Sequence, residues 1–148
     1  MFSDKTKPII VILRVVLGWL FFYTGLHQVL DKAWSAYDLL VSAKTFPDFF
    51  SFFANPDIIH WVNIANSWGL LLIGASLIIG LYVRFTSVMG MILMALYYLL
   101  LLNFPYASES GYLVDKHVIY FLSLLVLFVT RAGDYWGIDA QVILRIKD

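Results

Sequence analysis

Residues 8–30 read PIIVILRVVLGWLFFYTGLHQVL, an apolar run interrupted by four polar residues, Arg14, Thr24, His27 and Gln28. As a helix this run is about 34 Å long, enough to cross the roughly 30 Å hydrocarbon core of a bilayer. Two lysines precede it, as in a signal peptide, but the run is too long for the apolar region of one and no A-x-A-like cleavage site follows. The run therefore predicts a retained membrane-spanning helix.

Three further apolar runs, at residues 61–80, 86–103 and 112–130, are each close to the length of about 20 residues that a membrane-spanning helix needs. Helices are expected because every backbone group in lipid must find its hydrogen-bond partner inside the protein. We predict an all-α integral membrane protein, with residues 1–148 forming one domain. Its architecture is a four-transmembrane-helix bundle with spans at about 8–30, 61–80, 86–103 and 112–130.

The composition supports a membrane protein and narrows its chemistry. Hydrophobic residues make up 61% of the chain and charged residues only 14%, with a mean hydropathy of +0.83. The formal net charge is zero, which argues against a nucleic-acid partner held through phosphate contacts. The chain has no cysteine, which excludes disulfides and Cys-ligated zinc or iron–sulfur centres within it. No metal or flavin motif is present.

The lysines and arginines predict the orientation in the membrane. Four spans place both termini on one side, and cytoplasmic loops are enriched in lysine and arginine. Three of these residues fall on the opposite side, Lys32, Lys44 and Lys116. Seven fall on the side of the termini, Lys5, Lys7, Arg14, Arg84, Arg131, Arg145 and Lys147. We therefore predict that both termini are cytoplasmic (N-in, C-in).

Residues 31–60 form the long connection between the first two spans and would lie on the outer side. Thirty structureless residues are unusual in a compact domain. The clustered aromatic and aliphatic residues, with few charges, are typical of helices in the membrane interface. We predict an outer aromatic interfacial segment of two short helices, punctuated by Pro47 and Pro56. It serves either as an anchoring aromatic belt or as a lid.

Polar residues collect at the outer ends of the four predicted helices. They are His27, Asn63, Asn66, Asn103, Asp115 and His117. Ionisable groups at membrane depth are costly and point to function by default. Convergent polar groups beneath an aromatic lid suit a quinone, to which histidine can donate a hydrogen bond and a proton. We predict His117 and Asp115 as the catalytic pair, and a cofactor-binding cavity lined by His27, Asn63, Asn66, Trp68 and Asn103.

Other interpretations of the same residues stay open. Asp115 is also a good N-cap for the fourth helix, and Asn63 and Asn66 also suit hydrogen bonds between helices. Since Asp115 and His117 are two residues apart, a helix would point them to different faces. His27 and His117 also suggest bis-histidine haem ligation, although bulky flanking residues leave little room for a macrocycle. A metal site formed by both with His60 is a further alternative.

Arg14 and several small residues bear on how the predicted helices pack against one another. Arg14 either extends its side chain to the inner interface or faces the bundle and pairs with helix ends or with Asp134. Small residues let helices approach closely in membranes. Those on the first two spans are Gly18, Gly25, Gly69, Ser76 and Gly80.

The stretches LRVVLGWLFFYTGLHQVLD, AKTFPDFFSFFANP, WGLLLIGASLIIGLYVRF, LVDKHVIY and AGDYWGID together resemble the DoxX family of small four-helix membrane proteins. That family includes the DoxD-type subunit of thiosulfate:quinone oxidoreductase. The resemblance implies a prokaryotic plasma membrane and a link to the quinone pool. The chain departs from the family pattern at His27, where lysine is frequent, and at Ser67 and Lys116, where acidic residues are frequent. Asp115 and His117 keep the pattern.

These observations lead to one principal functional hypothesis and two alternatives. The principal hypothesis is a quinone-associated subunit of a membrane oxidoreductase, working with a partner subunit or as a homo-oligomer. Thiosulfate oxidation would need such a partner, because no cysteine, metal cluster or flavin motif is present to take electrons from sulfur. The alternatives are a non-catalytic membrane scaffold or assembly partner and a small-solute permease.

Overall fold

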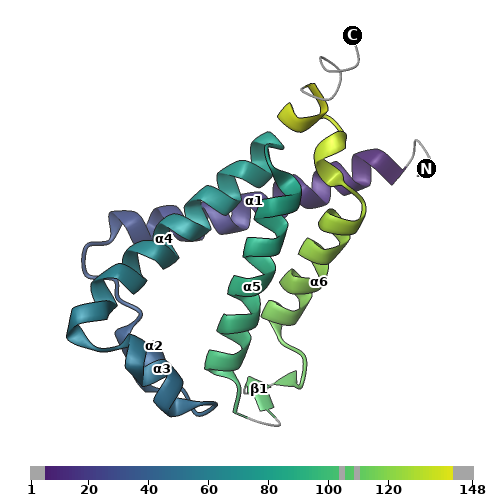
Figure 1. Ribbon diagram of the computed structural model, residues 1–148. Helices are drawn as coiled ribbons and strands as arrows, with labels where there is room; N and C mark the ends of the chain where they lie inside the picture. The colour runs from purple at the N-terminus through teal and green to yellow at the C-terminus, as the bar shows by residue number, and fades with distance from the viewer. Residues whose placement is uncertain (1–5, 104–105, 109–110, 142–148) are drawn as a thin grey trace.

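The computed structural model describes residues 6–103, 106–108 and 111–141 (Figure 1). The described chain is helical except for one short hairpin. Its elements are α1 (Thr6–Leu30), α2 (Tyr37–Val41), α3 (Pro47–Phe53), α4 (Pro56–Ile79), α5 (Val83–Leu101), β1 (Tyr106–Ser108), β2 (Gly111–Tyr112), α6 (Lys116–Val129) and the 3-10 helix η1 (Ala132–Asp134). The strands β1 and β2 pair antiparallel between α5 and α6.

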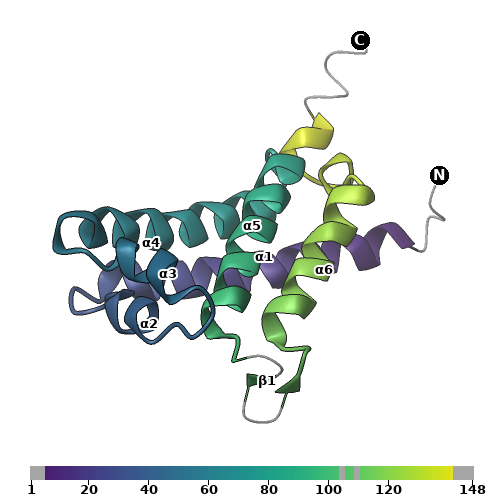
Figure 2. The same ribbon diagram turned by 60° about the horizontal axis from the view of Figure 1, so that its bottom comes forward.

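The long helices form two pairs that diverge from each other. In both views α1 lies beside α4, and α5 lies beside α6 (Figures 1 and 2). A core of buried aliphatic and aromatic side chains joins the pairs, with Phe21, Leu77 and Leu124 at 2%, 0% and 0% exposure. The short helices α2 and α3 lie at the end of the molecule opposite the start of α1 and η1.

The contact between α1 and α4 depends on glycine. A Cβ atom on Gly18 would lie 3.0 Å from the backbone O of Gly74, and one on Gly25 would lie 2.8 Å from Cα of Leu71. The backbones therefore approach closely, as the prediction for Gly18 and Gly25 requires. Gly69 has no such role, since a Cβ there would meet nothing within 4 Å. The glycine of α4 that does contact α1 is Gly74, which sequence reasoning missed.

Three helices have the length and hydropathy to cross a membrane among the described residues, namely α1, α4 and α5. This confirms the character of the first three predicted spans. Their boundaries differ, because α4 begins five residues earlier than predicted, at Pro56 behind the Asn55 cap. The fourth predicted span is shorter than expected: α6 is an apolar helix of 14 residues, or about 21 Å. The carboxylate of Asp115 caps its N-terminus, so residues 112–115 precede the helix.

The connection between α1 and α4 contains the short helices α2 and α3, and Pro47 and Pro56 are the first residues of α3 and α4. Proline suits the first turn of a helix, where its missing N–H has no partner to lose. Beneath α2 and α3 lies a second apolar cluster that includes Leu40, Phe50 and, from α5, Leu100. The segment thus packs onto the rest of the protein through one face.

Hydrogen bonds fix this connection to the elements that surround it. The backbone N–H of Ala36 donates to Oδ1 of Asn63 at 2.9 Å, and Oγ1 of Thr45 donates to the carbonyl of Leu102 at 2.8 Å. These bonds attach it to α4 and to the residue that follows α5. α3 also carries large exposed side chains, with Phe49 at 53% and Phe52 at 61% exposure.

At the other end of the molecule, Arg14 anchors the chain that follows α6. Its side chain is 1% exposed. Nη1 donates to the carbonyls of Ala132 at 2.7 Å and Tyr135 at 3.0 Å, and Nη2 donates to that of Trp136 at 3.1 Å. Arg14 therefore faces the bundle and binds backbone carbonyls at a helix end. Neither extension to the interface nor pairing with Asp134 describes it, because among the described residues its hydrogen-bond acceptors are these three backbone oxygens.

The anchored loop also positions the turn between α4 and α5. The carboxylate of Asp139 accepts hydrogen bonds from the backbone N–H groups of Tyr82 at 2.9 Å and Val83 at 3.1 Å. Gly80, with φ at +72°, ends α4, and its carbonyl accepts from the N–H of Asp139 at 3.0 Å. The start of α1, the α4–α5 turn and the loop after α6 are thus joined at one end.

Candidate functional site

A largely apolar pocket of about 310 Å³ lies beneath α2 and α3, against α4 and α5. Its wall is made of aliphatic and aromatic side chains except at Asn66 and Tyr97. The residues that line it are Ala36, Leu39, Leu40, Phe49, Phe50, Phe53, Val62, Ala65, Asn66, Leu93, Leu96, Tyr97 and Leu100. The pocket therefore has one polar end within an apolar enclosure.

A chain of hydrogen bonds across three helices forms this polar end. The hydroxyl of Tyr97 on α5 donates to Oδ1 of Asn66 on α4 at 2.8 Å. Nδ2 of Asn66 in turn donates to Oε1 of Gln28 on α1 at 2.9 Å. In an apolar setting such a chain holds each side chain in one orientation, because breaking it leaves buried polar atoms unpaired.

His117 on α6 extends the cluster to the fourth long helix. Its ring stacks on that of Tyr97, with centroids 5.7 Å apart and an interplanar angle of 13°, and meets Tyr120 edge to face at 6.5 Å. Only 7% of His117 is exposed. All four long helices therefore contribute to one group of polar and aromatic side chains.

Asp115 holds His117 in a defined orientation. Oδ2 of Asp115 lies 2.5 Å from Nδ1 of the imidazole, while Oδ1 accepts from the backbone N–H groups of His117 at 2.9 Å and Val118 at 3.3 Å. A carboxylate at Nδ1 selects the tautomer with its proton on that nitrogen and leaves Nε2 as the reactive nitrogen. Among the described residues, no hydrogen bond to Nε2 of His117 is found.

The expectation that Asp115 and His117 point to different helix faces is wrong. It assumed that both residues lie within the helix, whereas Asp115 is the N-cap and has extended backbone angles. From there its side chain turns back over the first turn and reaches both the His117 ring and its backbone. The capping interpretation of Asp115 is therefore correct, and it coexists with the contact to the imidazole.

The remaining predicted site residues lie away from this cluster. His27 is exposed on α1, and Trp68 is 48% exposed on α4. Asn103 is exposed and pairs through its backbone with Tyr106. Asn63 binds the connection before α2, with Nδ2 donating to the hydroxyl of Ser35 at 3.1 Å.

Asn63 and Trp68 line a different hollow from the apolar pocket. This outer groove of about 330 Å³ runs between α1 and α4. It is lined by Gln28, Val29, Lys32, Trp34, His60, Asn63, Ile64, Ser67 and Trp68. Of the predicted cofactor-binding residues, Asn66 lines the apolar pocket, Asn63 and Trp68 line this groove, and His27 and Asn103 line neither.

Sequence reasoning missed Tyr97 and Gln28. Tyr97 reads as one more aromatic residue in an apolar helix, and only its contact with Asn66 gives the hydroxyl a role. Gln28 follows His27 directly, and neighbouring residues on a helix differ by about 100° in direction. The packing of α1 against α4 turns Gln28 inward and leaves His27 exposed.

The alternatives based on haem or a metal find no matching geometry in the described part of the chain. His27 is exposed on α1, whereas His117 is 7% exposed and stacks on Tyr97, so the structure does not place the two rings in one enclosed site. No group of three or more His, Cys, Asp or Glu side chains among those residues has the arrangement of a metal site.

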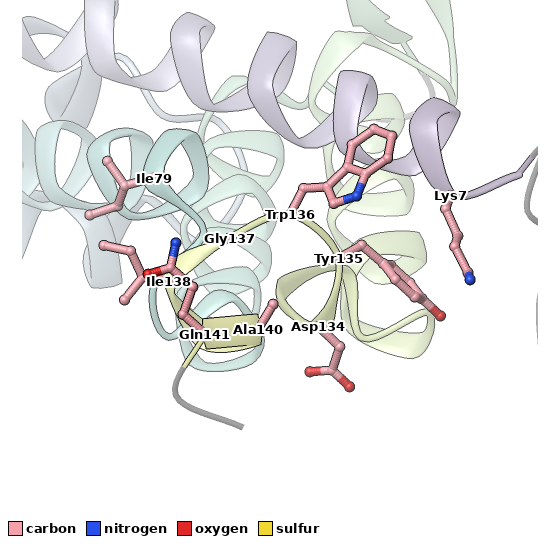
Figure 3. Close-up of a pocket in the computed structure, with 9 residues that line it drawn as sticks. All are labelled: Lys7, Ile79, Asp134, Tyr135, Trp136, Gly137, Ile138, Ala140 and Gln141. Atoms are coloured by element: carbon pink, nitrogen blue, oxygen red, sulfur yellow. The ribbon is translucent and has the colours of Figure 1, made fainter. Parts of the chain in front are cut away.

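A larger hollow of about 570 Å³ lies beside the loop that Arg14 anchors. Figure 3 shows it between Ile79, Ile138 and Gln141 on one side and Tyr135, Trp136 and Lys7 on the other. None of the predicted site residues lines it. Because its walls are mostly the anchored loop itself, we regard the smaller apolar pocket as the candidate functional site.

Comparison with known proteins adds one finding. A family model described as DoxX matches residues 9–102. The match covers Gln28, Asn66 and Tyr97 and ends before Asp115 and His117. Comparison with curated proteins and with solved structures gives no match.

Proposed function

Because this chain belongs to the DoxX family of membrane proteins, we propose that it is a quinone-associated subunit of an oxidoreductase, with the quinone bound in the apolar pocket. The observation that carries the proposal is the composition of the pocket, in which Asn66 and Tyr97 supply the polar groups of an apolar wall. Small-molecule sites typically combine apolar enclosure with a few polar groups that orient the ligand. A quinone matches this arrangement with its polar ring and apolar tail.

The size of the pocket supports a single ring rather than a larger group. A volume of about 310 Å³ is at the lower end of the range of about 300–1,000 Å³ for small-molecule sites. It accommodates one substituted ring and the start of a tail. Phe49 lines the pocket and is still 53% exposed, so the tail would leave beside Phe49 and continue along the apolar surface of α3.

A bound quinone would supply two-electron, two-proton redox chemistry. We assign His117 the handling of protons near this site, because its ring stacks on Tyr97. Asp115 binds Nδ1 and orients the imidazole, which leaves Nε2 to exchange a proton. Since His117 does not itself line the pocket, Tyr97 lies between the imidazole and the ligand.

The electron donor would be a partner subunit. Alternatively, a second copy of this chain would complete the complex as a homo-oligomer. The chain has no cysteine and so cannot ligate an iron–sulfur cluster through thiolates. The prokaryotic plasma membrane is the setting in which such a subunit meets the quinone pool.

We further propose that α6 is the fourth span and that both termini are cytoplasmic. Arg14 and Asp139 join the start of α1, the α4–α5 turn and the loop after α6 at one end, which requires an even number of crossings. The opposite end carries α2, α3 and the β1–β2 hairpin. The exposed apolar residues Leu113 and Val114 extend the apolar length of α6 on that outer side.

Single cysteines should reveal this topology, because the natural chain has none. We expect a membrane-impermeant maleimide to label Ser51→Cys on intact cells and to label Arg84→Cys and Gln141→Cys only after permeabilisation. All three side chains are exposed. Labelling of Gln141→Cys but not Arg84→Cys on intact cells would show that α6 does not cross. Labelling of Arg84→Cys and Gln141→Cys on intact cells, with Ser51→Cys labelled only after permeabilisation, would overturn the orientation.

Filling the pocket should abolish ligand binding. We expect Ala65→Phe, which adds a phenyl ring at the pocket wall, to weaken the binding of decylubiquinone to protein in nanodiscs by more than about tenfold, as measured by calorimetry. His117→Ala removes the ring behind Tyr97 and is expected to weaken binding as well.

The matched control is Ile92→Phe. It adds a similar ring to α5 at a side chain that is 51% exposed and outside the pocket, so binding should not change. No binding to the natural protein would refute the quinone site. Loss of a partner complex in the variants without any ligand binding would instead favour the scaffold, and solute uptake by reconstituted vesicles would favour the permease.

A further inference from the structure

We propose that the pocket selects the reduced, hydroxyl-bearing form of its ligand, a hydroquinone, over the oxidised form with carbonyl oxygens. This inference rests on the proposed function and deepens it. It follows from the direction of the two hydrogen bonds that join Gln28, Asn66 and Tyr97.

The first bond sets the orientation of the Asn66 amide. Oε1 of Gln28 accepts from Nδ2 of Asn66, so the amide nitrogen faces α1. Oδ1 of Asn66 is thereby turned towards α5, where it accepts the hydroxyl proton of Tyr97. A tyrosine hydroxyl has one proton and two lone pairs. With that proton committed to Asn66, Tyr97 can offer a ligand only an acceptor.

The polar end of the pocket therefore presents an acceptor on Tyr97, to which a ligand hydroxyl can donate. A quinone carbonyl can only accept, so it leaves the lone pairs of the Tyr97 oxygen without a donor in an apolar surrounding. The other lining side chains are apolar and cannot compensate. The reduced form gains one hydrogen bond that the oxidised form cannot make.

Gln28 is thus a specificity-determining residue, although it does not line the pocket. If the Asn66 amide were turned over, its N–H would donate to Tyr97, and the freed tyrosine proton would suit a carbonyl. In the structure Oε1 of Gln28 faces Nδ2 of Asn66 and favours the first orientation. The preference should therefore depend on the hydrogen-bonding character of residue 28 rather than on its size.

The test compares the anaerobic binding of decylubiquinol and decylubiquinone to protein in nanodiscs. We expect the natural protein to bind the quinol about three- to tenfold more tightly, the contribution of one net hydrogen bond. Tyr97→Phe should bring this ratio close to one by weakening quinol binding alone. Gln28→Leu should also bring it close to one, whereas Gln28→Glu keeps the acceptor and should keep the preference.

The control is Tyr98→Phe. The hydroxyl of Tyr98 donates to the carbonyl of Leu113 outside the pocket, so its removal should not change the ratio of the two affinities. Equal affinities in the natural protein, or tighter quinone binding, would overturn the inference while leaving the proposed pocket intact. A quinol preference that survives both Tyr97→Phe and Gln28→Leu would overturn it too. If neither form binds, the proposed function is wrong and the inference falls with it.

Discussion

Replacing Gly74 with alanine is expected to force α1 and α4 apart and to cause a large loss of stability. A Cβ atom at residue 74 would lie 2.5 Å from Cα of Phe22 and 2.7 Å from the carbonyl O of Gly18. These are backbone atoms, which cannot rotate away as a side chain does. Overpacking of this kind costs about 3 kcal/mol or more when the neighbours cannot adjust.

The measurement is the thermal unfolding of purified protein in detergent, and the matched control is Gly69→Ala. Gly69 lies on the same helix, and a Cβ there meets nothing within 4 Å. Alanine also has the higher helix propensity, so Gly69→Ala should retain or slightly raise the unfolding temperature. Equal unfolding temperatures for the two variants would show that α1 and α4 do not pack through Gly74. Because α4 carries Asn66 and α1 carries Gln28, Gly74→Ala should weaken ligand binding as well.

The second large effect is expected for Arg14→Met. The substitution keeps a long side chain but leaves the carbonyls of Ala132, Tyr135 and Trp136 without their donor. Hydrogen bonds to a charged group contribute about 1.5–3 kcal/mol each, and buried acceptors without a partner add a penalty. We expect a loss of about 3–5 kcal/mol, the range seen when one partner of a buried charged interaction is removed.

Undocking of the loop after α6 should be visible directly. Residues 132–139 should exchange their amide hydrogens faster in Arg14→Met than in the natural protein, as followed by mass spectrometry. Arg14→Lys should recover only part of the loss, since an ammonium group does not reproduce the planar fork that reaches three carbonyls. The control, Arg131→Met, changes an exposed arginine and should leave exchange unchanged. Unaltered exchange in Arg14→Met would mean that Arg14 does not anchor the loop.

The site shows how far one sequence can guide a structural prediction. Asn66, Asp115 and His117 stood out because polar groups are rare in apolar helices, and the structure places all three in or beside one cluster. His27 stood out for the same reason and is exposed. Rarity identifies a residue that needs an explanation, but it does not say which way the helix turns that residue.

The sequence by itself determined the properties that depend on local chemistry. Hydropathy and length predicted the helices α1, α4 and α5, and Pro47 and Pro56 predicted breaks in the connection, at which the structure begins α3 and α4. Each follows from a preference of a residue or a short run for its own surroundings, whether lipid or the first turn of a helix.

Only the tertiary structure decided which faces meet. The approach of α1 to α4 through Gly18 and Gly74 turns Gln28 inward, and the crossing of α5 brings the hydroxyl of Tyr97 to Asn66. The docking of the loop after α6 gives Arg14 its partners. The physical reason is that a hydrogen bond or a close backbone contact needs two surfaces, and each helix sequence specifies only one of them.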